Sequence, residues 1–532
     1  MCGRWTAGGW NGSNKAGAVW SRLEGMQLSQ SIKKRLGVIV LVLISILEIT
    51  SCAKTPKEKV VADKSEGLAK ESILPKETDT PKDLGIPKHW KETLDRSDGF
   101  VTLEADCDTN IPEIYNTPVY SYEMASLKKD WLSRLCGYFA KGDKLYEYPE
   151  MTKDELRKEK EKIANYEGRW ATWSKGGQLT TYWEGMLKTM DELIEKAPEE
   201  RAENKYIEAN LGMPYQTEKD YFNEVSDYYY DTDDKIGLTA RVDRGRECDP
   251  VIRAVDYDDK VGSTTKFVYS QGTFVDEIDL AELEFDNAES TEAYDEWLGR
   301  LREEAGADVG LTQEEALKKV DKMLKDLSIK GFEVSDCVKA VGNEDTESWA
   351  LLEEAGLEKS VGYSVYLYRK AGDVMGYSQR SPMIYDDLPE TVYAPYFSAE
   401  KIRAIITEDG IQRFEWTDIS KKKDTIADNT KLLSFQEIQE KLADHLLYGA
   451  LADGGEELKS EGAGYLYKVR KVQLRAANIN AYEEPSAAWM VPVWVFDLER
   501  TGVTGTGENL GWGTETVVLN AIDGGYISMN IE

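Results

Sequence analysis

Trp489-Met-Val-Pro-Val-Trp-Val-Phe496 is the stretch that decides the fold, because an unbroken run of aromatic and β-branched residues predicts a buried strand. Downstream lies Val517-Val-Leu-Asn-Ala-Ile-Asp-Gly-Gly-Tyr-Ile527. Its Asp523-Gly524 step predicts a hairpin, since the favoured hairpin turns need residues that tolerate positive φ. These two stretches predict antiparallel strands at the C-terminal end of the chain.

Two stretches upstream predict helix starts. Leu311-Thr-Gln-Glu-Glu315 and Leu433-Ser-Phe-Gln-Glu437 both have the capping-box pattern, in which a hydroxyl and a carboxylate satisfy each other's free backbone amides. Apolar residues at helical spacing follow each box: Leu317, Val320, Leu324 and Leu327 in the first, and Ile438, Leu442 and Leu446 in the second.

The first capping box is followed by the same order of signals as the second. An aromatic strand, Tyr363-Ser-Val-Tyr-Leu-Tyr368, precedes an Asp-Gly hairpin between Ile405 and Phe414. The helix, the aromatic strand and the Asp-Gly hairpin follow in the same order in both stretches, each roughly 100 residues long, which favours duplication over coincidence. We therefore expect two repeated modules of one helix and an antiparallel sheet, at residues 306–420 and 421–532. Pro492 cannot donate a ladder hydrogen bond, so we expect its strand at an edge or a bulge.

The preceding region, residues 97–305, predicts a separate α+β domain. Its opening strand is Phe100–Ala105, helices are expected around 127–139, 153–166 and 181–196, and further strands at 237–242 and 265–269. The fold class is therefore α+β, with an N-terminal α+β domain followed by the two modules. Residues 53–96 are dense in Lys, Glu, Asp and Pro, which predicts a charged flexible tether.

The N-terminal 52 residues contain an export pattern. Lys33-Lys-Arg35 precedes the apolar run Leu36–Leu47, and Ile49-Thr-Ser-Cys52 ends it. The run is too short for a spanning helix, which needs about 20 apolar residues, so cleavage is favoured over an uncleaved signal anchor. Residues 1–25 lack apolar periodicity, and Met26 begins a conventional leader, so we expect translation to start there.

This layout resembles the signal peptide and lipobox of bacterial lipoproteins, with Ile49 and Ser51 at the aliphatic and small positions and Glu48 as a departure from the pattern. The resemblance implies that Cys52 becomes the lipid-bearing N-terminus. It also implies attachment to the outer face of the cell membrane, where two acyl chains anchor more firmly than one.

The C-terminal copy, with Val491–Trp494 and Val518–Ile527, resembles PepSY-type domains, which share a helix, aromatic strands and a final hairpin. The whole layout is also similar to uncharacterised lipoproteins of gut Firmicutes, which have no established activity. The paired modules resemble the exported YycH and YycI proteins, which regulate a sensor kinase; a likeness of fold alone does not transfer that function.

Composition excludes several functional classes. The net charge of −32 opposes binding to nucleic acid, which needs clustered Lys and Arg. The chain has only two histidines, so His-dependent catalysts and zinc hydrolases are disfavoured. His89 falls in the tether, and His445 follows a helical apolar stripe that predicts a partly buried structural residue.

Four cysteines follow Cys52, namely Cys107, Cys136, Cys248 and Cys337. They permit three disulfide pairings but have no recognisable disulfide or metal spacing. Cys136 follows Leu132 and Leu135 on an expected helix, where a buried thiol is as plausible as a bridge.

Three further patterns suggest sites. Asp231, Asp233 and Asp234 are candidate calcium ligands, although the run lacks the EF-hand spacing and also fits an acidic surface loop. The Gly-rich stretch 502–513 lies between two strands, so we expect a hairpin connection and no nucleotide or other cofactor. Tyrosines that fit sugar stacking or, at strand spacing, core packing are Tyr115, Tyr120, Tyr122, Tyr393 and Tyr396.

No catalytic constellation stands out in the sequence. We therefore expect a non-enzymatic, lipid-anchored cell-envelope protein that binds or regulates a protein partner. The alternative is an extracytoplasmic carbohydrate-binding protein or glycan hydrolase, which needs only two carboxylates at a suitable distance.

Overall fold

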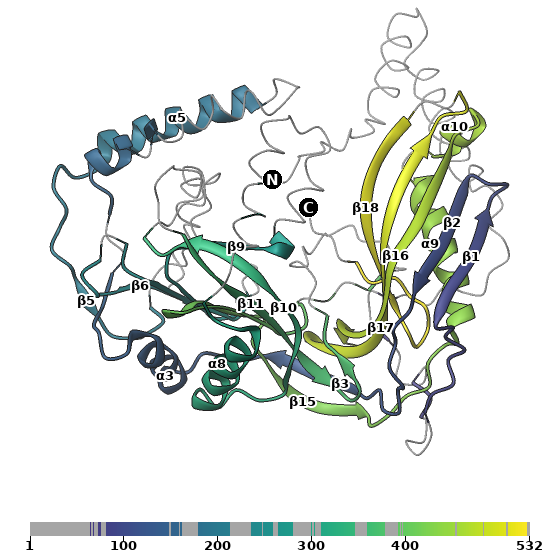
Figure 1. The fold of residues 1–532 in the computed structure, drawn as a ribbon, viewed down its shortest axis with the longest axis horizontal. Coiled ribbons are helices and arrows are strands. Elements are labelled where there is room, and N and C mark those ends of the chain that lie inside the picture. Colours follow the sequence, from purple (N-terminus) through teal and green to yellow (C-terminus); the bar gives the residue numbers. More distant parts are fainter. Residues whose placement is uncertain are drawn as a thin grey trace, which may run out of the picture. The chain divides into compact units, whose positions relative to one another are not determined.

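The structure is a computed structural model. It describes residues 64, 67–68, 73–75, 81–147, 150–158, 160–161, 179–212, 236–246, 248–258, 264–279, 299, 303, 310–345, 359–377, 392–393, 395, 397–452, 455–481, 484–506 and 509–528. These residues form a mixed α+β protein, as the sequence predicts for the class, and strands predominate over helices. The strands are organised in two sheets (Figure 1).

The seven-stranded sheet combines strands from both ends of the chain. Its order is β1 (His89–Arg96), β2 (Val101–Asp108), β16 (Gly464–Ala481), β17 (Glu484–Val503), β3 (Val119–Met124) and β15 (Ser420–Ala427), and β18 (Asn509–Asn520) also pairs with β17. Only the β2–β16 pair is parallel; the other pairs of this sheet are antiparallel.

Helix α9 (Phe435–Ala452) packs against β1, β2 and β18 of this sheet. It begins as the capping box predicts, because the Ser434 hydroxyl accepts the Glu437 amide and Glu437 accepts the Ser434 amide. Phe435, in its first turn, contacts Trp90 and Trp494 edge-on or tilted, with ring centroids 5.1 Å away in both cases. A short helix, α10 (Gly455–Ser460), follows.

The eleven-stranded sheet is antiparallel throughout its pairings. Its order is β5 (Tyr206–Ile207), β4 (Leu145–Glu147), β6 (Gly237–Val242), β7 (Val251–Val255), β8 (Lys266–Ser270), β14 (Gly410–Thr417), β13 (Lys401–Thr407), β11 (Ser360–Ala371), β10 (Phe332–Asn343) and β9 (Thr273–Asp276), and β12 (Val374–Met375) also pairs with β11.

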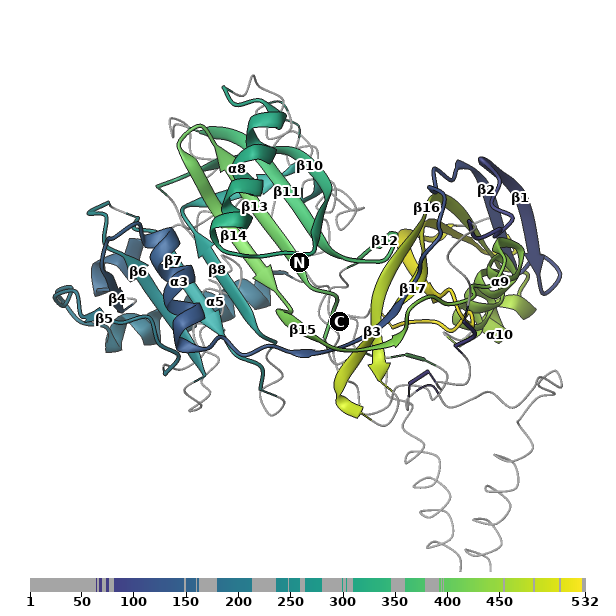
Figure 2. The same ribbon diagram turned by 90° about the horizontal axis from the view of Figure 1, so that it is seen from below.

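Helices α3 (Lys129–Ala140) and α8 (Gln313–Asp326) share one hydrophobic core with the eleven-stranded sheet (Figure 2). Phe139 of α3 stacks on Tyr269 with ring centroids 4.7 Å apart. α8 begins at the predicted capping box of Thr312 and Glu315 and buries Ala316, Val320 and Met323. The expected helix at 181–196 lies within α5 (Leu179–Lys196).

The pairing corrects the predicted domain boundaries. Strands β4–β9 come from the expected domain 97–305, yet they share one sheet with β10–β14 of the expected module 306–420. β2 instead pairs with β16, β3 pairs with β17 and β15, and β1 pairs with β2 at the edge of the same sheet. Apolar periodicity shows where strands occur, but partners far apart in sequence are chosen by packing of the two faces, which periodicity does not encode.

The predicted tether also ends earlier than expected. Residues 89–96 form β1, and Trp90 is only 2% exposed. Leu68 and Leu84 are buried in the core of the seven-stranded sheet. A few apolar residues among many charged ones are enough to dock a segment when a preformed core accepts them.

Pro492 lies in a central strand, so the predicted edge position is wrong. β17 pairs with β16 along its length, while its other side pairs with β3 up to Met490 and with β18 from Val493. The Pro492 carbonyl accepts the Ala521 amide at 2.9 Å. In an antiparallel strand the N–H and C=O of one residue point to the same side. The nitrogen of Pro492, which has no hydrogen, therefore points to the side where β3 ends and β18 begins. No ladder donor is lost there.

Both Asp-Gly turns are present where the sequence predicts them. In the first, Thr407 of β13 is in register with Gly410 of β14. In the second, Leu519 bridges Tyr526, and the Gly524 amide donates to the Asn520 carbonyl at 2.7 Å. The Gly-rich stretch connects β17 to β18 as a hairpin, as expected.

Candidate binding groove

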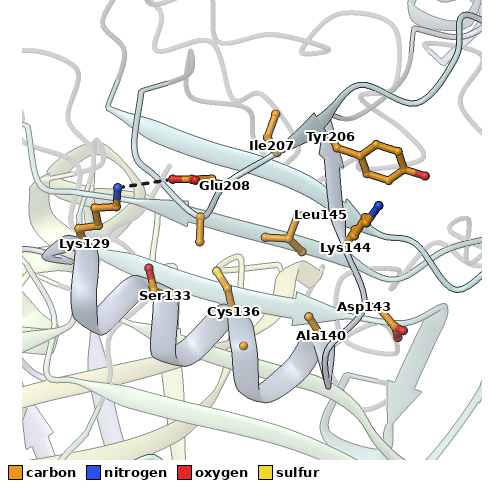
Figure 3. Close-up of a pocket in the computed structure, with 12 residues that line it drawn as sticks. Lys129, Ser133, Cys136, Ala140, Asp143, Lys144, Leu145, Tyr206, Ile207 and Glu208 are labelled. Atoms are coloured by element: carbon orange, nitrogen blue, oxygen red, sulfur yellow. Dashed lines mark ion pairs between the residues drawn. The ribbon is translucent and has the colours of Figure 1, made fainter.

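A groove lies between helix α3 and the β4–β5 end of the eleven-stranded sheet (Figure 3). Leu132, Leu135 and Phe139 of α3 face the core. The neighbouring flank presents Ser133, Cys136, Gly137 and Ala140 to the groove, which has a volume of about 580 Å³. These side chains are small, so an occupant can approach the helix backbone closely.

The opposite wall is formed by β4 and β5. Leu145 of β4 is in register with Ile207 of β5, and both line the groove together with Ala209. β5 is the last strand of the sheet, and within the described residues no strand pairs with its outer side. An open strand edge offers unpaired backbone donors and acceptors to an extended peptide.

Each end of the groove has charged or polar side chains (Figure 3). At one end Lys129 and Glu208 form an ion pair with an N–O distance of 3.5 Å. Both side chains are largely exposed, so this pair contributes little to stability and can open for a ligand. At the other end the Tyr206 hydroxyl donates to Asp243 at 2.7 Å, which raises the pKa of Tyr206. Lys144 lies over the Tyr206 ring, 4.8 Å from its centroid.

The thiol that lines the groove is not activated as a nucleophile. It belongs to Cys136, and burial raises the pKa of this thiol to about 12. The thiolate that a nucleophile requires is therefore not populated near neutral pH. What remains is an apolar floor, a free strand edge and two polar ends, which together can hold an extended segment by backbone hydrogen bonds and alternate side chains.

The structure does not describe the site residues predicted from the sequence. Cys52 and the calcium candidates Asp231, Asp233 and Asp234 fall outside the described residues. In the part of the chain that is described, no group of three or more His, Cys, Asp or Glu residues is arranged to hold a metal ion. None of the helices in that same part is long and apolar enough to cross a membrane.

The cysteine and histidine predictions can be compared with the structure. Cys107, Cys136, Cys248 and Cys337 form no disulfide within the described chain, and of the two alternatives for Cys136 the structure shows the buried thiol. His89 lies exposed on β1, with its ring nitrogens 2.8 Å from Asp106 and Asp108, which raise its pKa.

The tyrosines named for sugar stacking do not gather on one surface. Tyr122 and Tyr393 are 5% and 1% exposed and belong to the core of the seven-stranded sheet, whereas Tyr115 is 39% exposed. Tyr120 packs edge-on against Tyr122, with a centroid distance of 6.4 Å. Tyr396 lies outside the described residues. Of the two buried members, Tyr122 belongs to β3, whereas Tyr393 lies outside the named strands and forms an isolated bridge with Ile527.

Nothing in the sequence pattern identifies the groove before the fold is known. The small residues Ser133 and Gly137 are four apart on one helix flank, which is the only local signal. β5 has just two residues, and it follows its partner β4 by about 60 positions. Such a short, distant strand gives no periodicity to detect.

Comparisons with known proteins do not assign a family. No family model matches the chain, and no curated protein matches it. Among solved structures, an uncharacterized protein from Eubacterium rectale matches 87% of this chain and 98% of its own, with 12% sequence identity and a TM-score of 0.38. At that score the likeness supports no conclusion about fold or function.

Proposed function

We propose that this protein is an exported lipoprotein, anchored through Cys52 on the outer face of the cell membrane, that binds a protein partner without catalysing a reaction. The anchor is supported by the basic cluster, apolar run and small-residue exit of residues 33–52. The occupant we assign to the groove is an extended segment of the partner, added as a strand along β5.

The observation that supports binding is that no strand of the described chain pairs with the outer side of β5, which borders an apolar groove. Strand addition derives affinity from main-chain hydrogen bonds, and alternate side chains supply specificity. Ile207 and Leu145 would contact every second side chain of the added strand. A polar side chain of that strand could also take the place of Lys129 or Glu208 in their ion pair.

We also propose that the two helix-plus-sheet units arose as a repeat with PepSY-like order. In the first unit α8 precedes β10, β11 and β13, which pair consecutively, and in the second α9 precedes β16, β17 and β18. Both helices begin at a capping box. Each unit is completed by strands from elsewhere in the chain, so the proposed repeat is one of sequence order and not of independent domains.

Photo-cross-linking in intact cells tests the binding proposal. A photoreactive residue is placed at Ser133, which is exposed and lines the groove, and in a control at Lys318, which is exposed on α8. We expect one defined protein adduct from position 133 and none of the same mass from position 318. Recovery of glycan alone, or equal adducts from both positions, would refute the proposal. Labelled palmitate, incorporated by the wild type and not by Cys52→Ser, tests the anchor separately.

A further inference from the structure

We term the described residues of 64–88 the entry segment. Leu68 is 2% exposed in the core of the seven-stranded sheet. The Leu74 carbonyl accepts the Lys431 amide at 2.7 Å. Further on, the Lys82 ammonium donates to the Asn429 side chain and the Thr430 carbonyl, each at 2.7 Å. These contacts hold the entry segment against residues that lie more than 300 positions later.

Lys64 is held by what we term the Asp523 cluster, formed by Lys64, Tyr393, Asp523 and Gly525. One carboxylate oxygen of Asp523 accepts from the Lys64 ammonium at 2.9 Å and from the Tyr393 hydroxyl at 2.8 Å. The other accepts the Gly525 amide at 2.9 Å. The Lys64 ammonium also lies 4.9 Å from the centre of the Tyr393 ring.

The cluster is largely shielded from solvent. The side chains of Lys64 and Asp523 are 15% and 26% exposed, and Tyr393 is 1% exposed. Burial, together with the carboxylate of Asp523, raises the pKa of Tyr393, which keeps its hydroxyl a donor. Gly525 leaves room for the ammonium, because a Cβ at this position would lie 2.0 Å from the Lys64 nitrogen. Hydrogen bonds in which a partner is ionised are about twice as strong as those between neutral groups.

The distance from the predicted lipid to this cluster is limited by covalent geometry. Eleven residues, 53–63, separate Cys52 from Lys64. Twelve Cα–Cα steps therefore join Cys52 to Lys64, and a fully extended chain of that length spans about 43 Å. The cluster therefore stays within that distance of the bilayer surface whenever Cys52 is acylated.

We propose that the Asp523 cluster is the membrane-proximal end of this protein, and that the surface around it faces the lipid bilayer. This inference rests on the proposed acylation of Cys52. The contacts of Lys64 with the cluster hold one end of the 53–63 span, so they limit how far the surface beside Asp523 and α9 can lie from the membrane. A longer free tether would let the protein turn any face toward the bilayer.

Energy transfer to labelled lipid tests this orientation. The acylated full-length protein is reconstituted in vesicles with an acceptor-bearing lipid, and a donor is attached at position 441, an exposed residue of α9 that packs beside Gly524. The pair is chosen so that its Förster distance exceeds the maximum tether span. We expect more than half of the donor energy to be transferred. Thirty Gly/Ser residues inserted before Lys64 raise the mean tether span roughly twofold, so transfer should fall.

Two substitutions test the cluster itself. Asp523→Asn removes the charge, and Gly525→Ala places a methyl group where the Lys64 ammonium lies; both should lower transfer toward the value of the lengthened chain. Asp321→Asn, on the exposed face of α8, is the matched control and should leave transfer unchanged. Low transfer in the acylated wild type, or transfer that neither the insertion nor Asp523→Asn changes, overturns the inference.

Failure of the anchor is distinguishable from failure of the cluster. If the wild type incorporates no palmitate, the proposed function is wrong. The cluster is then tested in the soluble full-length Cys52→Ser protein by hydrogen exchange of a peptide that contains Gly67, whose amide donates to the Lys64 carbonyl at 3.0 Å. Asp523→Asn should speed that exchange by about tenfold. An unchanged rate means that Asp523 does not hold the entry segment.

Discussion

His445 illustrates how a single residue in this chain is placed by its neighbours on a helix. It follows Leu442 by three positions on α9, and its ring stacks on Tyr526 with centroids 3.9 Å apart. The side chain is half-buried, and desolvation lowers its pKa to about 4. The prediction of a partly buried structural histidine is thereby confirmed.

This pKa predicts how stability depends on pH. The folded state favours neutral His445, so its contribution is fully present above pH 6.5, the ordinary pKa, and is lost as pH falls from 6.5 to 4. We expect the loss to be about 2 kcal/mol, allowing for partial exposure.

Denaturant unfolding of the wild type and His445→Phe at pH 7 and pH 4 isolates this contribution, because the phenyl ring keeps the stack on Tyr526 and does not titrate. The wild type should lose more stability than the variant between the two pH values. Equal losses would show that His445 does not titrate between them.

Strand β17 shows how a central strand can contain a proline, a residue normally found only in edge strands or bulges. It is central and long, yet contains Pro492, because its partner on one side changes from β3 to β18 at that residue. The next residue, Val493, turns its amide toward β16, where it is in register with Arg475. Position 493 therefore needs an N–H to complete the ladder with β16, whereas position 492 does not.

We expect Pro492→Ala to cost about 1–2 kcal/mol of unfolding free energy, from greater freedom of the unfolded chain and lost packing. Val493→Pro should cost about 3 kcal/mol or more beyond Val493→Ala, because it also removes a ladder donor. Urea unfolding of the three variants measures these differences. Equal costs for Val493→Pro and Val493→Ala would contradict the assigned register.

At the scale of the whole molecule, the described chain leaves the seven-stranded sheet after β3 and returns to it at β15. The seven-stranded sheet takes β1–β3 from the start of the chain and β15–β18 from its end, while the strands between them form the eleven-stranded sheet. Glu400, which is 2% exposed, links the two sheets: it accepts from Trp416 of β14 at 2.7 Å and from the Ser420 hydroxyl of β15 at 3.3 Å.

This connectivity predicts that residues 421–532 do not fold alone, although the sequence suggests a module there. Without β1–β3, β16 loses its partner β2 and β17 loses its partner β3. Phe435 also loses its contact with Trp90. A chain that joins residues 64–125 to 419–532 through a Gly/Ser linker should instead unfold cooperatively.

Near-UV circular dichroism and thermal unfolding distinguish these outcomes. A sharp transition in the fragment 421–532, matching that of the joined chain, would show that the module is independent and that the pairing of β2 with β16 is dispensable. A transition present only in the joined chain would confirm that both ends of the sequence form one folding unit.

Local sequence was sufficient for the features that depend on nearby residues. The capping boxes at Thr312 and Ser434, the Asp-Gly turns, the α+β class and the burial of Cys136 follow from contacts within a few positions. Tertiary structure alone decided which strands pair, why Pro492 fits a central strand, that Lys64 binds Asp523, and that β5 leaves a groove beside α3. Each of these depends on residues far apart in the chain, which are brought together by burying shared apolar faces and not by any local spacing.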